Sequence, residues 1–187
     1  AIKSLLEVSP KGSFYVSTTG MASRELYEIR DINKDSHSFD FLTVGSMGHS
    51  SSIALGIAKA KSKKRIICLD GDAAALMHLG SMAIIGTEEP ENFVHIVLNN
   101  GAHDSVGGQP SVAQKISLTS IAKACNYKNI YSVSSKEEIN SLKESISSEK
   151  GPIFIELIIK KGSRKDLGRP KTTPLANKES FMEQLKL

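Results

Sequence analysis

The stretch CLDGDAAALMHLG, residues 68–80, decides the fold of this 187-residue chain. It begins inside an apolar run, RIICLD at residues 65–70, which has the length and β-branched content of a buried strand. Asp70 and Asp72, separated by one glycine, end the run, and a helix-like segment of small residues follows directly. A strand that passes straight into a helix is typical of a βα unit in a parallel sheet.

The rest of the chain repeats this alternation of strand and helix. Strands are predicted at residues 13–18, 39–44, 65–70, 93–100, 129–134 and 152–160. Helices are predicted at residues 21–31, 49–62, 73–86, 118–127, 135–149, where Ser135 is the expected N-cap, and 177–187. The central strands are continuous apolar runs, which indicates that both of their faces are covered. We therefore predict one α/β domain over residues 1–187, with a parallel, doubly wound six-stranded sheet and helices on both faces.

Composition excludes several classes of partner. No run approaches the roughly 18 apolar residues of a membrane span, so no membrane partner is expected. The net charge of +4 comes from scattered lysines, and aromatic residues make up only 5% of the chain, so no nucleic-acid platform is expected either. Cys68 and Cys125 form no C-x-x-C pair and are predicted to be reduced core thiols of a cytoplasmic protein.

Polar, glycine-rich segments follow the first four predicted strands. They are TTGMAS at 18–23, GSMGHSSS at 45–52, DGDAA at 70–74 and NNGAHDSVGGQPS at 99–111. Because ligands of open parallel sheets bind beyond the carboxyl ends of the strands, these segments are the candidate site. Asp72 is either a helix N-cap or the ligand of a divalent cation that neutralises a phosphate at the helix start. Asn100, after the next strand, brings an amide oxygen to the same edge.

Other site motifs are absent from the sequence. No Walker A segment, no G-x-G-x-x-G after the first strand and no G-x-S-x-G elbow occurs. The five histidines show no zinc-ligand spacing. His49 and His103 lie in strand-end loops and are the better functional candidates, whereas His78 and His95 are expected to be packed or surface residues. An unrelated nucleotide-binding module is therefore disfavoured.

The motifs GDA and NN, together with GSMGHSSSIALGIA at 45–58 and GGQP at 107–110, resemble the diphosphate-binding domain of thiamine diphosphate-dependent enzymes. Within that family the pattern is most similar to the 2-keto acid decarboxylases that act on phosphonopyruvate, and next to those that act on sulfopyruvate. The resemblance implies a carbon–carbon lyase that uses thiamine diphosphate and Mg²⁺ to decarboxylate 3-phosphonopyruvate to phosphonoacetaldehyde and CO₂. A domain that has lost its cofactor is the other alternative.

The resemblance also implies site residues. Asp72 and Asn100 would bind Mg²⁺ through side chains and Ala102 through its carbonyl, with Asn99 as an alternative to Asn100. The implied cofactor contacts are Gly45, Ser46, Met47, Gly71, Asp72, Ala73, Ala74, Asn100, Ala102 and His103. Gly45 would accept a hydrogen bond from the aminopyrimidine and Ala73 and Ala74 would turn N–H groups to the diphosphate. Met47 would support the bent cofactor, although an ordinary core methionine is nearly as good an interpretation. Thr18, Thr19 and Gly20 are further candidates for the diphosphate or substrate side.

Two departures from the family pattern stand out. Ala73 occupies a position where the family usually has glycine, so a positive φ there would weaken cofactor binding, whereas a negative φ would make the change mild. The activating glutamate of the family lies in a pyrimidine-binding domain, which these residues do not contain. The resemblance therefore implies that this chain is part of a longer enzyme or a subunit, inactive without a pyrimidine-binding partner, in a homo-oligomer. Residues 101–111 are expected to be a loop that closes over the substrate or is simply flexible, and residues 160–176 an exposed basic arm.

Overall fold

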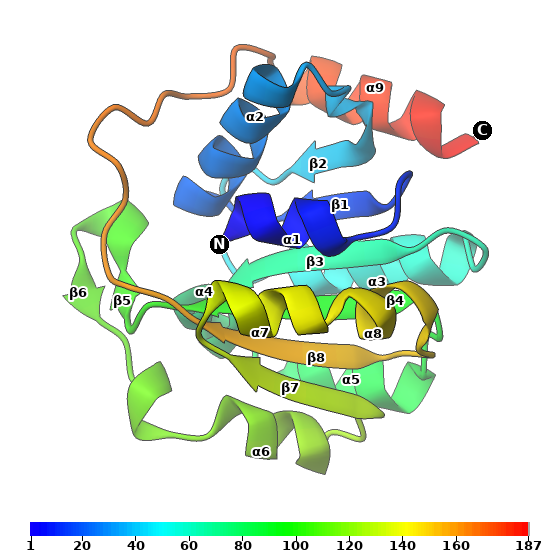
Figure 1. Ribbon diagram of the computed structural model, residues 1–187, viewed down its shortest axis with the longest axis vertical. Helices are drawn as coiled ribbons and strands as arrows, with labels where there is room; N and C mark the ends of the chain where they lie inside the picture. Colours follow the sequence, from blue (N-terminus) through cyan, green and yellow to red (C-terminus); the bar gives the residue numbers. More distant parts are fainter. Residues whose placement is uncertain (187) are drawn as a thin grey trace.

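The computed structural model describes residues 1–186 and contains a six-stranded, wholly parallel sheet (Figure 1). The strand order is β2-β1-β3-β4-β8-β7. The strands are β1 (Phe14–Ser17), β2 (Asp40–Leu42), β3 (Ile66–Gly71), β4 (Phe93–Asn99), β7 (Asn129–Val133) and β8 (Ile153–Ile158). All six predicted strands are thus confirmed, and β3 and β4 lie side by side at the centre.

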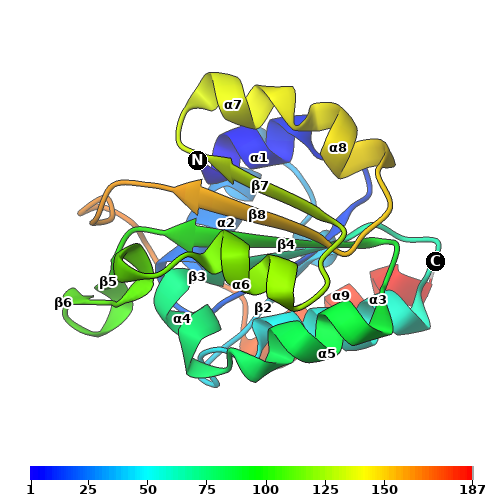
Figure 2. The same cartoon turned by 90° about the horizontal axis from the view of Figure 1, so that it is seen from below.

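Helices cover both faces of the sheet, as the doubly wound prediction requires (Figure 2). One face carries α1 (Ile2–Val8), α2 (Met21–Asn33), α7 (Lys136–Ser141) and α8 (Lys143–Ser148). The opposite face carries α3 (Ser50–Ala60), α4 (Asp72–Met77), α5 (Gly80–Glu88), α6 (Leu118–Ala124) and α9 (Pro174–Lys186). No helix within residues 1–186 has both the length and the apolar character needed to cross a bilayer.

Each face of the sheet has its own hydrophobic core. Because successive strand residues point to opposite faces, Ile67 and Leu69 of β3 pack under α1, whereas Ile66 and Cys68 pack against the other layer. All four side chains are fully buried. Complete burial of such an aliphatic side chain stabilises a fold by about 1.5–3 kcal/mol, which explains why the central strands contain almost no polar residues.

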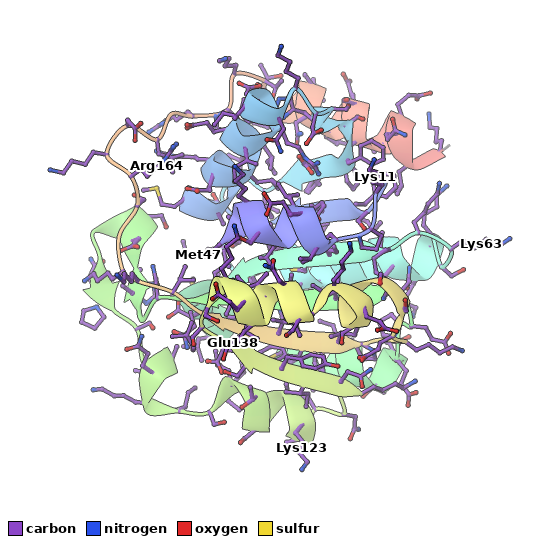
Figure 3. All side chains as sticks on the ribbon, viewed as in Figure 1. Lys11, Met47, Lys63, Lys123, Glu138 and Arg164 are labelled. Atoms are coloured by element: carbon purple, nitrogen blue, oxygen red, sulfur yellow. The ribbon has the colours of Figure 1, made fainter. Side chains whose placement is uncertain are left out.

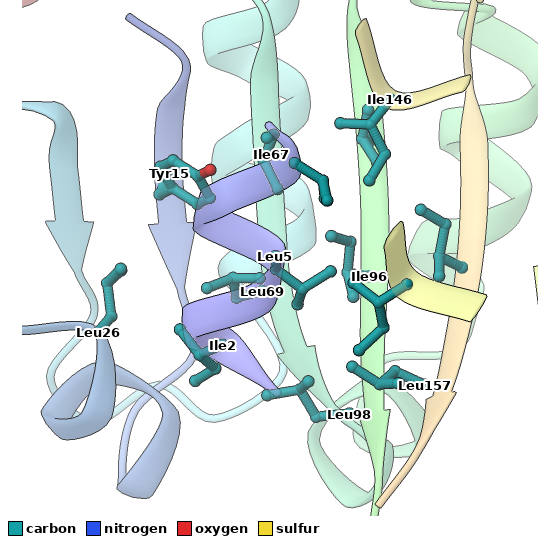
Figure 4. Close-up of a cluster of buried hydrophobic side chains, with 14 of the residues drawn as sticks. Ile2, Leu5, Tyr15, Leu26, Ile67, Leu69, Ile96, Leu98, Ile146 and Leu157 are labelled. Atoms are coloured by element: carbon teal, nitrogen blue, oxygen red, sulfur yellow. The ribbon is translucent and has the colours of Figure 1, made fainter. Parts of the chain in front are cut away.

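Helix α1 has no counterpart in the sequence-based prediction. It has only seven residues, too few to display a helical period clearly. Ile2 and Leu5 nevertheless insert between side chains of β3 and β4, with exposed fractions of 5% and 0% (Figure 4). Tertiary packing, rather than a local signal, therefore specifies this helix.

Several predicted boundaries need correction. The predicted helix at 73–86 is two helices, α4 and α5, and the one at 135–149 is divided into α7 and α8 at Leu142. Helix α9 begins at Pro174, three residues early, because proline suits the first turn of a helix; its predicted last residue, 187, lies outside the described part. The Ser135 cap is confirmed as a capping box with Glu138.

The predicted loop at 101–111 is partly ordered. It contains a two-stranded antiparallel ladder of β5 (Ala102–His103) and β6 (Gln109–Pro110), joined by a 3₁₀ turn, η2 (Asp104–Val106). Two further 3₁₀ turns, η1 (His37–Phe39) and η3 (Ala113–Lys115), precede β2 and α6. The glycine-rich segment is therefore a small hairpin that projects from the carboxyl edge of the sheet.

Candidate cofactor site

A cavity of about 340 Å³ lies at the carboxyl ends of β1, β3 and β4. A volume of this size is in the range of small-molecule and cofactor pockets. It brings together most of the predicted site residues: Met47, Gly71, Asp72, Ala73, Ala74, Asn100, Ala102 and His103, with Thr18 and Thr19. The lining does not include Gly20, Gly45 or Ser46, although each of them lies within two positions of a residue that lines the cavity.

Asp72 is the first residue of α4 and is only 2% exposed. Its Oδ2 accepts a hydrogen bond from the Ser111 hydroxyl. Burial raises the pKa of Asp72 above its ordinary value, while the hydrogen bonds from Ser111 and from the backbone of Ala73 oppose that rise. An ionised carboxylate held in this partly desolvated place is well suited to a divalent cation.

The two asparagines at the end of β4 point to different surroundings. Asn99 is buried, donates to Glu156 Oε1 at 2.7 Å and accepts from the N–H of Gly101 at 3.1 Å. Asn100 lines the cavity, donates to Asp104 Oδ2 at 2.7 Å and accepts from the N–H of Ala102 at 3.0 Å. Each amide oxygen keeps a second lone pair, but only that of Asn100 belongs to a residue that lines the cavity, so Asn100 is the better placed of the two to bind a metal ion.

Ala102 and His103 form the short strand β5 on the cavity wall. The register partner of Ala102 is Pro110, and beside this pair Ser111 donates its N–H to the Gly101 carbonyl at 2.8 Å. Ala102 and Pro110 are therefore a non-hydrogen-bonded pair of the antiparallel ladder, and the Ala102 carbonyl is not directed at β6.

Ala73 lies in the first turn of α4 and lines the cavity. Among residues 1–186, positive φ outside glycine occurs at Lys34, Ser46, Glu89 and Asn126, so Ala73 has an ordinary negative φ. The backbone therefore does not need glycine at position 73, and the alanine brings one methyl group without strain.

The turn before α3 is unusually constrained. The φ angles of Gly45, Ser46 and Gly48 are 68°, 45° and 90°. A positive φ is ordinary for the two glycines, but residues with a side chain, such as Ser46, rarely adopt it. A Cβ on Gly48 would lie 2.7 Å from the Ala74 carbonyl oxygen, so this turn is packed tightly onto α4. Met47, between them, is thereby presented to the cavity.

Two residues that support the site could not be recognised as site residues from the sequence. Ser111 holds Asp72, and Glu156 of β8 holds Asn99. Both contacts join segments far apart in the chain, so no local pattern reveals them.

Asp70, the other acid of the opening stretch, does not line the cavity. It is fully buried, accepts the N–H of Gly71 at 2.9 Å and faces His95 Nε2 at 3.4 Å, and His95 Nδ1 lies 3.0 Å from the Tyr127 hydroxyl. His95 is thus a packed histidine, as predicted, and Asp70 braces the turn that leads to Asp72. His78 is exposed, with its ring centroid 4.1 Å from that of His49.

The residues present fit a magnesium-bound diphosphate. The Thr18 hydroxyl is buried at the cavity wall and has no hydrogen-bond partner among the described residues, so it is free to donate to an anion. Asp72, Asn100 and Ala102 line the same cavity and offer carboxylate, amide and carbonyl oxygens, the ligands that Mg²⁺ prefers.

Comparison with models of protein families finds a match to the domain that contains this cavity. The model of the thiamine pyrophosphate enzyme C-terminal TPP-binding domain matches residues 18–157. The chain belongs to this family. The match begins directly after β1 and covers β2, β3, β4, β7 and all but the last residue of β8, which confirms the thiamine diphosphate-binding fold expected from the sequence motifs.

Curated relatives of this TPP-binding domain are decarboxylases. A phosphonopyruvate decarboxylase of Streptomyces viridochromogenes is 39% identical over 93% of this chain and 42% of the relative, and one of Streptomyces hygroscopicus is 38% identical over 98% and 44%. The beta subunit of a sulfopyruvate decarboxylase of Methanocaldococcus jannaschii is 32% identical over 99% of this chain and 95% of the relative. The chain thus spans less than half the length of the phosphonopyruvate decarboxylases it matches.

A solved structure has the same fold. It is described as a putative thiamin diphosphate-dependent enzyme from Mycobacterium smegmatis and superposes with a TM-score of 0.61 at 15% identity, covering 87% of this chain and 31% of that one. At this identity the likeness concerns the arrangement of the sheet and helices.

Proposed function

We propose that this TPP-binding domain is the diphosphate-binding part of an enzyme that decarboxylates 3-phosphonopyruvate to phosphonoacetaldehyde and CO₂ with thiamine diphosphate and Mg²⁺. The observation that carries the proposal is the 39% identity to a phosphonopyruvate decarboxylase along 93% of the chain. The clustering of Asp72, Asn100 and Ala102 at one cavity supports the metal and cofactor part of it.

In this proposal Asp72, Asn100 and the Ala102 carbonyl hold Mg²⁺, whose charge offsets both the buried carboxylate and the diphosphate. The N–H groups of Ala73 and Ala74, in the first turn of α4, and the Thr18 hydroxyl would donate hydrogen bonds to the diphosphate. Bound thiamine diphosphate supplies the electron sink that makes loss of CO₂ possible.

The remaining cofactor contacts orient the organic part of the cofactor. Met47 would support the bent cofactor, and the Gly45 carbonyl would accept a hydrogen bond from the aminopyrimidine. Ser46, Gly71 and His103 complete the proposed contacts.

The proposal includes a pyrimidine-binding domain or subunit that supplies the activating glutamate, in an oligomeric, cytoplasmic enzyme. The beta-subunit relatives are consistent with such a partner, since their names describe one component of an assembly. By itself the chain described here is expected to be catalytically inactive.

Sulfopyruvate is the second candidate substrate. It is supported by the M. jannaschii beta subunit, which aligns along 99% of this chain. Phosphonopyruvate and sulfopyruvate share the 2-keto acid and differ in the anionic group on carbon 3, so both are compatible with the same cofactor site.

Steady-state decarboxylation by the complete enzyme, assembled with any partner subunit, tests the proposal. We expect a kcat/KM for phosphonopyruvate at least about tenfold above that for sulfopyruvate, a difference of about 1.4 kcal/mol in the activation free energy. The opposite ratio would establish the second candidate, and turnover of neither acid would overturn both. Calorimetry with thiamine diphosphate and Mg²⁺ checks the cofactor separately.

A further inference from the structure

The segment that follows β8 forms one wall of the cofactor cavity. The sequence alone indicated only an exposed basic arm at 160–176, but Ile159, Lys160, Gly162, Ser163 and Arg164 all line the cavity. We call residues 160–168 the strap. In Figure 1 it leaves the end of β8, passes the β5–β6 hairpin and turns back toward α2 and α9.

The strap is attached at several points along its path. The N–H of Gly162 donates to Asp104 Oδ2 at 2.8 Å, and the Lys161 ammonium donates to the Gly108 carbonyl. Asp104 Oδ2 also accepts from the amide of Asn100, a proposed metal ligand. The position of the strap is therefore tied to the same hairpin that carries the metal site.

The strap brings positive charge to the cavity. Among the lysines and arginines of the described chain, only Lys160 and Arg164 line this cavity. Arg164 pairs with Glu28 on α2 through Nη2, and its Nε lies 3.8 Å from Asp166 Oδ1. Lys160 has no carboxylate within ion-pair distance among residues 1–186. Figure 3 shows Arg164 and Met47 on the side toward which the strands point, with Lys11 and Lys63 at the opposite side.

We propose that Lys160 and Arg164 form the subsite for the phosphonate or sulfonate group of the substrate. This inference rests on the proposed function and adds to it the residues that distinguish an anionic 2-keto acid from a neutral one. An ammonium group without a carboxylate partner binds such an oxyanion directly, and the planar guanidinium of Arg164 can present two N–H groups to it. The cofactor diphosphate already has Mg²⁺ and the start of α4, so the strap cations are left for a second anion.

The test compares charge-neutral variants of the complete enzyme loaded with thiamine diphosphate and Mg²⁺. Lys160→Gln and Arg164→Gln each remove one cavity cation, and Arg164→Lys keeps the charge without the fork. Lys165→Gln is the matched control, because Lys165 is an exposed strap residue that does not line the cavity. The measurements are KM and kcat for both acids, kcat/KM for pyruvate, and the Kd of thiamine diphosphate.

We expect Lys160→Gln to raise KM for the preferred anionic acid by about tenfold, the scale of one charge-assisted hydrogen bond, with kcat changed less than about twofold. kcat/KM for pyruvate and the Kd of thiamine diphosphate should stay at wild-type values, as should all constants of Lys165→Gln. Arg164→Lys should lose less than Arg164→Gln. Because phosphonate can carry two charges and sulfonate carries one, phosphonopyruvate should suffer more.

Two results would overturn the subsite. An equal rise in the Kd of thiamine diphosphate would assign the cations to the cofactor, and equal effects of Lys160→Gln and Lys165→Gln would reduce them to a general field. If the wild-type enzyme turns over neither acid, the proposed function fails. The subsite is then tested by competition between methylphosphonate and a bound 2-keto acid. This competition should be lost in Lys160→Gln and kept in Lys165→Gln.

Discussion

At the scale of single residues, burial of the Asp72 carboxylate opposes the stability of the fold, whereas the same carboxylate suits the binding of a metal ion. This carboxylate is almost completely buried and accepts hydrogen bonds from Ser111 and from the backbone, yet burial still raises its pKa. With its pKa raised, the folded chain holds this proton more tightly than the unfolded chain does. Stability from this residue therefore falls as the pH rises from the ordinary carboxyl pKa through the raised one.

The substitution Asp72→Asn is expected to stabilise the cofactor-free protein at neutral pH and to impair metal binding. The amide keeps the shape and can still accept from Ser111, so the free energy of unfolding should rise by about 1 kcal/mol, the usual scale of single substitutions. The Kd for Mg²⁺ in the presence of thiamine diphosphate should rise more than about 100-fold, since even outer ligand partners contribute 10–100-fold. Calorimetry and denaturant titration measure the two effects.

The pH dependence provides the control for that variant. The stability advantage of Asp72→Asn should disappear below the ordinary carboxyl pKa, where the wild-type side chain is protonated in both states. A variant that is less stable than wild type at pH 7 would show that the Ser111 hydrogen bond outweighs the cost of burying the charge.

Ala73 is the second residue whose role depends on a single local property. Because its φ is negative, Ala73→Gly should change the Kd of thiamine diphosphate by less than about threefold, while the lost helix propensity lowers the free energy of unfolding by up to about 1 kcal/mol. Titration of the complete enzyme with the cofactor gives the first quantity and thermal unfolding the second. An affinity gain of tenfold or more in the glycine variant would mean that the methyl group obstructs the diphosphate.

At the scale of elements, the contact between α5 and the end of α6 has no room for an added atom. A Cβ added to Gly86 would lie 1.5 Å from the carbonyl oxygen of Cys125, a backbone atom that no side-chain rotation can move away. Gly80, at the start of the same helix, has no atom within 4 Å of the corresponding position. One helix thus offers a crowded glycine and an open one.

Gly86→Ala is therefore expected to destabilise the protein by more than about 3 kcal/mol, or to reduce its soluble yield, because α5 must move away from Cys125. Gly80→Ala should be neutral or stabilising by up to about 1 kcal/mol through helix propensity. Paired thermal melts measure the difference, and equal melting temperatures of the two variants would contradict the close approach seen here.

At the scale of the whole molecule, the site depends on segments that meet only after folding. Asp72 follows β3, Asn100 and Ala102 follow β4, and Ser111 comes after the hairpin. A ligand that bridges these segments binds the folded state and stabilises it by an amount that grows with the logarithm of its free concentration over its Kd.

Thiamine diphosphate with Mg²⁺, each at about 100 times its Kd, should stabilise the domain that carries the site by about 2.7 kcal/mol. With EDTA in place of Mg²⁺ most of this gain should be lost, because the diphosphate then faces the buried Asp72 carboxylate without a cation between them. Thermal unfolding of the complete enzyme with cofactor, with and without metal, provides the measurement. Equal stabilisation in EDTA would argue against a metal held by Asp72, Asn100 and Ala102.

Much of this molecule follows from its sequence alone. The apolar runs and the helical segments between them predicted six parallel strands, and the polar segments after the first four strands predicted which edge of the sheet carries the candidate site, because both depend on the order of residues along one stretch of chain. The GDA and NN motifs, together with the GSMG and GGQP segments, indicated the family. The stretch at 68–80 therefore contained the decisive information about the fold.

Tertiary structure decided what depends on residues far apart in the chain. It showed that Asn100 rather than Asn99 faces the cavity, because Glu156 of the neighbouring strand holds Asn99 inside. It made α1 a helix by burying Ile2 and Leu5 against the sheet, and it brought the basic arm back to the cavity as the strap. These outcomes are set by side-chain packing and hydrogen bonds between segments that are distant in the chain. A local pattern of residues carries no information about such contacts.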